Sequence, residues 1–112
     1  MKLIYICSPF SGDVEGNIKR AQEYCREAIR AGYTLIAPHL LYPQILDDTN
    51  SMEREQGIQM GLYILEICDE IWVFGQDLTA GMDREVKFDK QKNIPVIYKS
   101  IQEQSMAMIF MQ

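Results

Sequence analysis

The stretch "TAGMDREVKF" (79–88) contains the acid that is best placed to do chemistry, Glu85. A carboxylate close to the end of a strand can act as a nucleophile or as a general base. An acid in the first turn of a helix is also favoured by the helix dipole alone. The residue pattern therefore leaves two interpretations of Glu85 open, a catalytic carboxylate and a simple helix-start acid.

A second stretch, "SPFSGDVEGN" (8–17), leads from a short apolar run into an expected helix. It offers small and polar groups beside a helix N-terminus: Ser8, Ser11, Gly12 and Asn17. Backbone N–H groups and the helix dipole at such a place suit an anion such as phosphate. The stretch has neither the G-x-G-x-x-G pattern nor the lysine of a P-loop, so a turn with a helix cap is an equal alternative.

Three side chains elsewhere could serve the same chemistry. His39 is the only histidine and follows Pro38, where either a solvated loop residue or a general acid or base is expected. Arg54 and Arg84 could pair with a substrate phosphate, although surface ion pairs are the ordinary role of such arginines.

Apolar periodicity predicts the elements that position these residues. Short apolar runs predict strands at 2–7, 33–38, 70–75 and 94–98. Apolar residues three and four apart predict helices at about 13–31, 50–68 and 82–92. Asp13 and Asn50 are suited to begin the first two helices, and Gly32 is suited to end the first. The long loop from 39 to 50 is a candidate lid or pocket wall.

This alternation predicts an α/β fold with right-handed crossovers and a parallel sheet of four to five strands, covered by helices on both faces. In such a flavodoxin-like or Rossmann-like three-layer sandwich, the first and third strands are neighbours. Ligands bind outside the carboxyl ends of the strands at that point. The loops after the first and third strands are therefore expected to meet in one crevice, with Glu85 at its mouth.

Length and charge limit the class of protein. The 112 residues are expected to form one domain, and their net charge of −5 argues against a nucleic-acid polymer as partner. No apolar run approaches the ~20 residues of a membrane helix, and no signal peptide is evident, so we expect no membrane partner and a cytoplasmic location. Cys7, Cys25 and Cys68 lack metal-ligand spacing and are expected to be reduced and buried.

Two apolar surfaces predict a homo-oligomer, either a dimer or a tetramer. The helix at 50–68 has a second apolar side, made of Met60, Tyr63, Ile64 and Ile67. The tail at 101–112 ends in "MAMIFMQ", which is too apolar to remain in water and is expected to be an oligomer contact.

The order and spacing of these motifs resemble those of the nucleoside 2-deoxyribosyltransferase superfamily, which includes small hydrolases of deoxynucleoside 5′-monophosphates. The resemblance covers about residues 3–98. It rests on Tyr5 in "IYICSPFSG", on "LYILEICDEIWVF", on Gly81 four residues before Glu85, and on "KNIPVIY".

The resemblance implies a covalent mechanism that needs no metal or organic cofactor. Glu85 would attack C1′ of a 2-deoxyribosyl group while the base leaves, and water or a second base would then accept the sugar with net retention. Tyr5 would orient Glu85 by a hydrogen bond. Backbone N–H groups around Gly81 and Met82 would position the sugar. The loop after the first strand would hold a 5′-phosphate through Ser8, Pro9, Phe10, Ser11 and Gly12.

Three departures from the family pattern affect this expectation. Gly61 replaces an aspartate that contacts the base, Thr79 replaces a second acid, and Asp89 replaces a common alanine. Protonation of the leaving base would then fall to Asp77, to His39 or to a carboxylate of a partner chain.

The resulting hypothesis is an enzyme that cleaves or transfers the N-glycosidic bond of a nucleoside or a nucleoside 5′-monophosphate. The alternative is a non-catalytic protein that senses or sequesters a nucleotide on the same fold, which the missing acids favour. A mainly structural oligomer is a third possibility, and it leaves the loop after the first strand unexplained.

Overall fold

The computed structural model describes residues 1–10, 12–47, 49–75 and 78–99. Its strands are β1 (Leu3–Cys7), β2 (Thr34–Ile36), β3 (Glu70–Phe74) and β4 (Val96–Lys99). Its helices are α1 (Val14–Arg30), α2 (Ser51–Glu66) and α3 (Ala80–Gln91), with two short 3₁₀ helices, η1 (Pro38–Leu40) and η2 (Tyr42–Gln44). The predicted tail contact at 101–112 lies outside the described residues.

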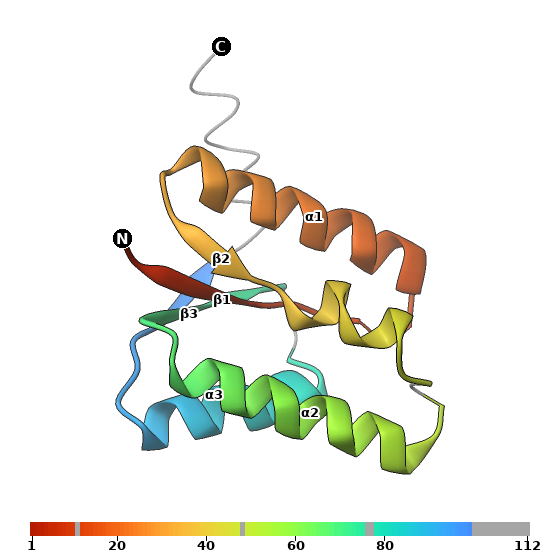
Figure 1. Cartoon of the computed structure of the whole chain (residues 1–112). Coiled ribbons are helices and arrows are strands. Elements are labelled where there is room, and N and C mark those ends of the chain that lie inside the picture. The colour runs from red at the N-terminus through yellow and green to blue at the C-terminus, as the bar shows by residue number, and fades with distance from the viewer. Residues whose placement is uncertain (11, 48, 76–77, 100–112) are drawn as a thin grey trace.

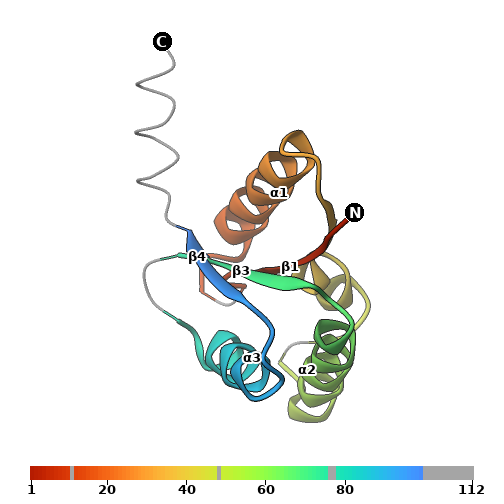
Figure 2. The same cartoon turned by 90° about the vertical axis from the view of Figure 1, so that its left-hand side faces the viewer.

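The four strands form one parallel sheet in the order β2-β1-β3-β4. Helix α1 covers one face of the sheet, and α2 and α3 lie together on the other face (Figures 1 and 2). Strands one and three are neighbours, with Tyr5 paired to Ile71 and Cys7 to Val73. The predicted α/β class, the three layers and the adjacency of strands one and three are confirmed.

Alternation along the strands sends side chains to two separate cores, because successive residues of a strand point to opposite faces. Tyr5 and Cys7 of β1 pack toward α2 and α3, in a core that includes Leu65, Cys68, Ile71, Val73, Met82 and Val86. Ile4 and Ile6 pack toward α1, with Tyr24, Cys25, Ala28, Trp72 and Phe74. The register of β1 therefore directs Tyr5 and Cys7 toward the helix that carries Glu85.

The helix caps explain where the elements begin. Asp13 accepts a hydrogen bond from the Gly16 N–H, and Asn50 accepts from the N–H groups of Met52 and Glu53, as predicted. Gly32, just after α1, has a φ of 89°, which is the left-handed conformation expected of a glycine there.

Helix α3 begins two residues earlier than predicted, since the Thr79 hydroxyl accepts a hydrogen bond from the Met82 N–H at 3.2 Å and caps the helix. Glu85 is therefore the sixth residue of α3 and lies beyond its first turn, where Asp83 is the acid. The interpretation of Glu85 as a helix-start acid is wrong.

The cap predicts a difference between two Thr79 variants. Thr79→Ala should lower the free energy of unfolding by about 1 kcal/mol, whereas Thr79→Asp should leave it nearly unchanged, because aspartate caps helices at least as well as threonine. Urea denaturation measures both values. Equal losses in the two variants would show that the hydroxyl does not cap α3.

The chain between β2 and α2, predicted as a loop, contains η1 and η2. Pro38 is the first residue of η1, and Pro43 is the second residue of η2. The fixed φ of proline suits the start of a helical turn. At the other end of the chain, β4 starts later than predicted. Asn93 has a φ of 60° and the Ile94 N–H still bonds the carbonyl of Asp89, so the backbone is turning there.

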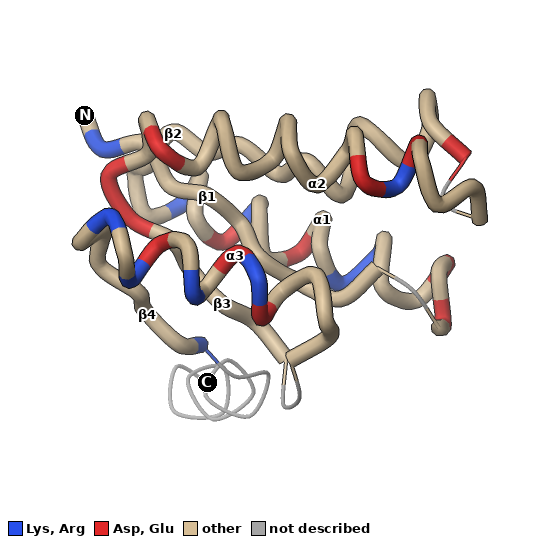
Figure 3. The backbone as a smooth tube through the Cα atoms, turned by 90° about the horizontal axis from the view of Figure 1, so that it is seen from below, with Lys and Arg blue, Asp and Glu red and all other residues tan. Residues whose placement is uncertain are grey.

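The described surface carries both charge signs and an apolar strip. Lys and Arg alternate with Asp and Glu along the helices in the view of Figure 3, without a continuous basic stripe. Met60 and Tyr63 of α2 and Ile67 just after it are 38%, 76% and 68% exposed, so these three residues of the predicted second apolar side face outward. Ile64, the fourth residue of that side, packs against the core instead. Among the described residues, no helix is both long and apolar enough to cross a bilayer. The homo-oligomer stays a prediction.

Candidate active site

A pocket of about 370 Å³ lies beside the carboxyl end of β1, within the range of small-molecule sites. Its walls come from the loop after β1, from η1 and η2, and from the first turns of α2 and α3. Five of the predicted site residues line it: Tyr5, Phe10, His39, Gly81 and Glu85. The segment between β2 and α2 thus forms a pocket wall.

Glu85 is the buried acid of this pocket, with a side chain only 5% exposed. Its Oε1 accepts a hydrogen bond of 3.0 Å from the Tyr5 hydroxyl. Its Oε2 has no hydrogen-bond partner among the described residues. One oxygen is therefore held in place by Tyr5, and the other is buried without a hydrogen-bond partner in the described part of the chain.

The surroundings of Glu85 act on its charge in opposite directions. Burial raises the pKa of Glu85, while the charge of His39 and hydrogen bonding from Cys7 and Tyr5 lower it. Burial also raises the pKa of Tyr5 well above its usual value, so its hydroxyl stays protonated and can donate. Burial is the largest of these effects, so the pKa of Glu85 lies above its usual value, and the contacts with His39, Cys7 and Tyr5 offset only part of that rise.

Gly61 explains how Tyr5 reaches Glu85. A Cβ atom at position 61 would lie 2.9 Å from the Tyr5 hydroxyl and 3.9 Å from Glu85 Oε1. The absence of a side chain on α2 therefore provides the space for the Tyr5–Glu85 hydrogen bond. The glycine at position 61 therefore has a physical reason in the packing of α2 over β1.

His39 lies on the other side of the carboxylate. Its Nε2 is 3.6 Å from Glu85 Oε1, which is longer than a hydrogen bond, and its side chain is 24% exposed. A histidine at the pocket wall and within reach of a carboxylate can exchange protons with a bound molecule.

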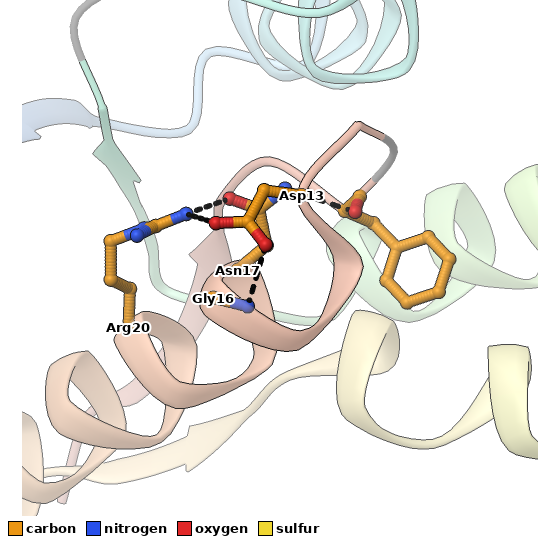
Figure 4. Close-up of polar contacts among 5 residues, drawn as sticks. Asp13, Gly16, Asn17 and Arg20 are labelled. Carbon is orange, nitrogen blue, oxygen red and sulfur yellow. Dashed lines mark hydrogen bonds and ion pairs between the residues drawn. The ribbon is translucent and has the colours of Figure 1, made fainter.

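The loop after β1 is fastened to the start of α1. The Asn17 side chain donates to the carbonyl of Phe10 at 3.0 Å and accepts from Arg20 at 2.7 Å (Figure 4). Asp13, which caps α1, also pairs with Arg20 at 3.5 Å. These contacts anchor the loop that brings Phe10 to the pocket.

The loops after β1 and β3 lie against each other. A Cβ atom at Gly75 would meet the Pro9 ring at 3.3 Å, and Gly75 has a φ of 106°. This contact agrees with the expected convergence of the two loops.

Several predicted residues do not line the pocket: Ser8, Pro9, Gly12, Asn17 and Met82. Ser8 is buried, and its hydroxyl has no hydrogen-bond partner among the described residues. Met82 is fully buried in the core, and its N–H is used by the Thr79 cap. Ser11 and Asp77 lie outside the described residues.

The two arginines differ in their surroundings. Arg84 forms a two-pronged ion pair with Glu55 at 2.8 and 2.9 Å, across the gap between α3 and α2. This pairing lowers the pKa of Glu55 to about 2. Arg84 therefore forms the ion pair that is ordinary for a surface arginine, and both Arg54 and Arg84 line the pocket.

Sequence reasoning assigned no role in the site to Cys7 or Asp89. The Cys7 thiol, predicted only as core, is buried and lies close enough to hydrogen-bond Glu85 and lower its pKa. Asp89 is fully buried, and neither of its carboxylate oxygens has a hydrogen-bond partner among the described residues. The spacing of four between Glu85 and Asp89 was the available signal, because it puts both on one face of a helix.

Comparison with solved structures identifies two similar folds. A 2-deoxyribosyltransferase from the psychrotolerant bacterium Bacillus psychrosaccharolyticus has a TM-score of 0.64 and 19% identity, over 88% of this chain and 72% of that one. A 2-desoxiribosyltransferase from Leishmania mexicana has a TM-score of 0.60 and 15% identity, over 89% of this chain and 65% of that one. At these identities the likeness establishes a common fold.

Comparison by sequence gives a family without a described activity. No curated protein matches the sequence significantly. Residues 2–99 match the family described as Domain of unknown function (DUF7768), which covers the whole sheet and all three helices. The chain therefore belongs to the DUF7768 family.

Proposed function

We propose that this protein cleaves or transfers the N-glycosidic bond of a nucleoside or a nucleoside 5′-monophosphate, with Glu85 as the nucleophile. The observation that carries the proposal is the buried Glu85 carboxylate, which lines a pocket of about 370 Å³ and has one oxygen held by Tyr5. The fold shared with two 2-deoxyribosyltransferases supports the same chemistry.

In the first step, the Glu85 carboxylate attacks C1′ of the sugar and forms a glycosyl ester. The C1′–N bond breaks, and its electron pair goes to the base nitrogen, which takes up a proton. Tyr5 keeps the carboxylate oriented through Oε1. His39, 3.6 Å from that oxygen, is the proton donor that we favour. Asp77 and a carboxylate of a partner chain remain the alternatives.

In the second step, water or the nitrogen of a second base attacks C1′ and gives a proton to the neutral His39. The ester bond breaks, and the electron pair returns to Glu85 as its carboxylate. Two displacements at C1′ give net retention of configuration. These steps require no redox change and are balanced by the proton that His39 gives and receives.

The substrate is held at both ends in this proposal. Phe10, His39 and the backbone near Gly81 contact the sugar and the base, since they line the pocket. The N-terminus of α1 and the loop before it bind a 5′-phosphate, because a helix N-terminus favours anions. The residues proposed for the phosphate are Ser8, Pro9, Ser11, Gly12 and Asn17. Met82 has only a packing role. The protein works in the cytoplasm as a homo-oligomer.

A substrate panel tests the proposed function. Purified protein is incubated with nucleosides and 5′-monophosphates, with and without a free acceptor base, and liberated or exchanged base is measured by chromatography. Release favoured by a 5′-phosphate supports hydrolysis of nucleotides, whereas exchange supports transfer. A complete lack of turnover, together with a melting temperature raised by one nucleotide, would instead favour the binding protein described next.

The second candidate function is nucleotide binding without turnover. Gly61 and Thr79 stand where the resembling family has acids, and in this structure both have other tasks, one in packing and one in capping. This specific observation favours a sensor or sequestering protein. The fate of the substrate in the panel separates the two candidates.

The role of His39 predicts a dependence on the leaving group. His39→Gln should lower the turnover number by ~10²-fold, the usual contribution of a general acid, with little change in KM. The loss in turnover number should be smaller on a substrate whose base leaves without being protonated. Steady-state kinetics on both substrates measure the difference. An equal loss on the two substrates would assign His39 to binding alone.

A further inference from the structure

Asp89 is a buried acid that the proposed mechanism does not use. It has no exposed surface, and both oxygens of its carboxyl group lack hydrogen-bond partners among the described residues. It follows Glu85 by four residues in α3, so the two side chains are neighbours on the same helix face.

The groups that face Asp89 offer it no compensating charge. Besides Glu85, its titratable neighbours include Cys7 of β1 and Cys68, just after α2. Burial is the main cause that raises the pKa of each thiol, and the charge of Asp89 raises it further. β3 and β4 contribute the apolar side chains of Ile71, Val73 and Val96 to this core.

The nearby lysine is engaged elsewhere. Lys92, at the end of the same helix, pairs with Glu66 at 3.3 Å. Among the described residues, Asp89 has no ion-pair partner. Burying a charged carboxylate without a partner costs free energy, so the neutral acid is the favoured form in these surroundings.

We propose that Asp89 is a positioning residue whose neutral form allows α3 to pack against the sheet and thereby keeps Glu85 in contact with Tyr5. When Asp89 loses its proton, the buried charge draws water between α3 and the sheet, and the contact between Glu85 and Tyr5 is weakened. The catalytic part of this inference rests on the proposed function. The structural part does not.

The direction of the pH effect follows from burial. Burial raises the pKa of Asp89 from 3.8 to about 7. The folded protein therefore binds more protons than the unfolded chain between these two values, and its stability falls as the pH rises through this window. The loss is complete once the pH exceeds the folded pKa. A variant whose residue 89 cannot ionise should not lose stability over this pH range.

The test compares wild type with Asp89→Asn, which keeps the size of the side chain and removes its charge. At pH 8 the variant should melt at least roughly 5 °C higher than wild type, and at pH 4 the two should melt alike. Asp89→Ala serves as a second uncharged variant. Asp83→Asn is the matched control, because Asp83 lies on the exposed side of α3 and pairs with Lys87, so it should keep the wild-type pH dependence.

Hydrogen exchange supplies a readout that needs no substrate. Protection of the α3 amides, relative to those of α1 in the same molecule, should decrease in wild type between pH 5 and pH 8 and stay constant in Asp89→Asn. Where turnover is measurable, kcat/KM of wild type should fall over the same range, and the variant should resist that fall.

The inference would be overturned if the melting temperature and the α3 amide protection of Asp89→Asn depended on pH as steeply as those of wild type. Loss of that slope without turnover in either protein would support the role of Asp89 in holding α3 and count against the proposed enzymatic function. Loss of the slope with an unchanged pH profile of kcat/KM would overturn the catalytic part.

Discussion

Replacing Glu85 by glutamine should abolish turnover and leave the fold at least as stable as wild type. An amide has the same shape as the carboxylate but does not attack C1′, so we expect a loss of at least ~10³-fold in kcat. The melting temperature should stay the same or rise, since burial disfavours the charge of Glu85 and its Oε2 has no partner among the described residues. Base-release assays and thermal denaturation measure the two effects.

Glu66→Gln is the matched control for this substitution. Glu66 is a half-exposed residue of α2 that pairs with Lys92 and does not line the pocket. An exposed ion pair contributes at most about 1 kcal/mol, so this variant should keep both its turnover and its stability. Turnover that survives in Glu85→Gln would remove Glu85 from the chemistry.

The second large effect is expected at Gly61. Gly61→Ala puts a Cβ atom at 2.9 Å from the Tyr5 hydroxyl, so Tyr5 must move away from Glu85. We expect a loss of about 1–3 kcal/mol in the free energy of unfolding, as for other overpacked cores. We also expect turnover to fall by ~10²-fold, because small displacements of a reacting group are costly. Urea denaturation and steady-state kinetics test both expectations.

Gly57→Ala is the control on the same helix. Its Cβ atom would meet only the flexible end of Leu46 at 3.4 Å, so alanine should stabilise α2 by up to ~1 kcal/mol. The double variant Gly61→Ala with Tyr5→Phe should regain stability, because the clashing hydroxyl is gone, but it should not regain turnover. Recovery of turnover in that double variant would show that the Tyr5 hydrogen bond is dispensable.

Much of the fold could be predicted because local signals agreed with one another. The apolar runs of β1 and β3 and the caps at Asp13 and Asn50 each mark an element, and alternation of the elements leads to the parallel sheet. The start of α3 was missed by two residues. Its apolar pattern begins at Met82, whereas the helix begins at the Thr79 cap, whose hydrogen bond is a matter of geometry.

The site was only partly predictable for a similar reason. Tyr5 and Glu85 are 80 residues apart, and their proximity followed from a resemblance and not from local pattern. The need for a glycine at position 61 depends on how closely α2 crosses β1. The apolar periodicity of the sequence predicts the helix but not this distance. Asp89 was visible through its spacing of four from Glu85 and as a difference from the family that the sequence resembles, but its complete burial depends on how α3 packs in the fold.

The most direct test of the central claim is to trap the glycosyl-enzyme ester on Glu85. Wild type and Glu85→Gln are mixed with the best substrate of the panel, quenched in acid within one turnover, and analysed by intact-protein and peptide mass spectrometry. The account predicts an added mass of one sugar, or one sugar phosphate, on the peptide that contains Glu85 in wild type and no addition in the variant. Base release without any adduct, or an adduct on another residue, would contradict it.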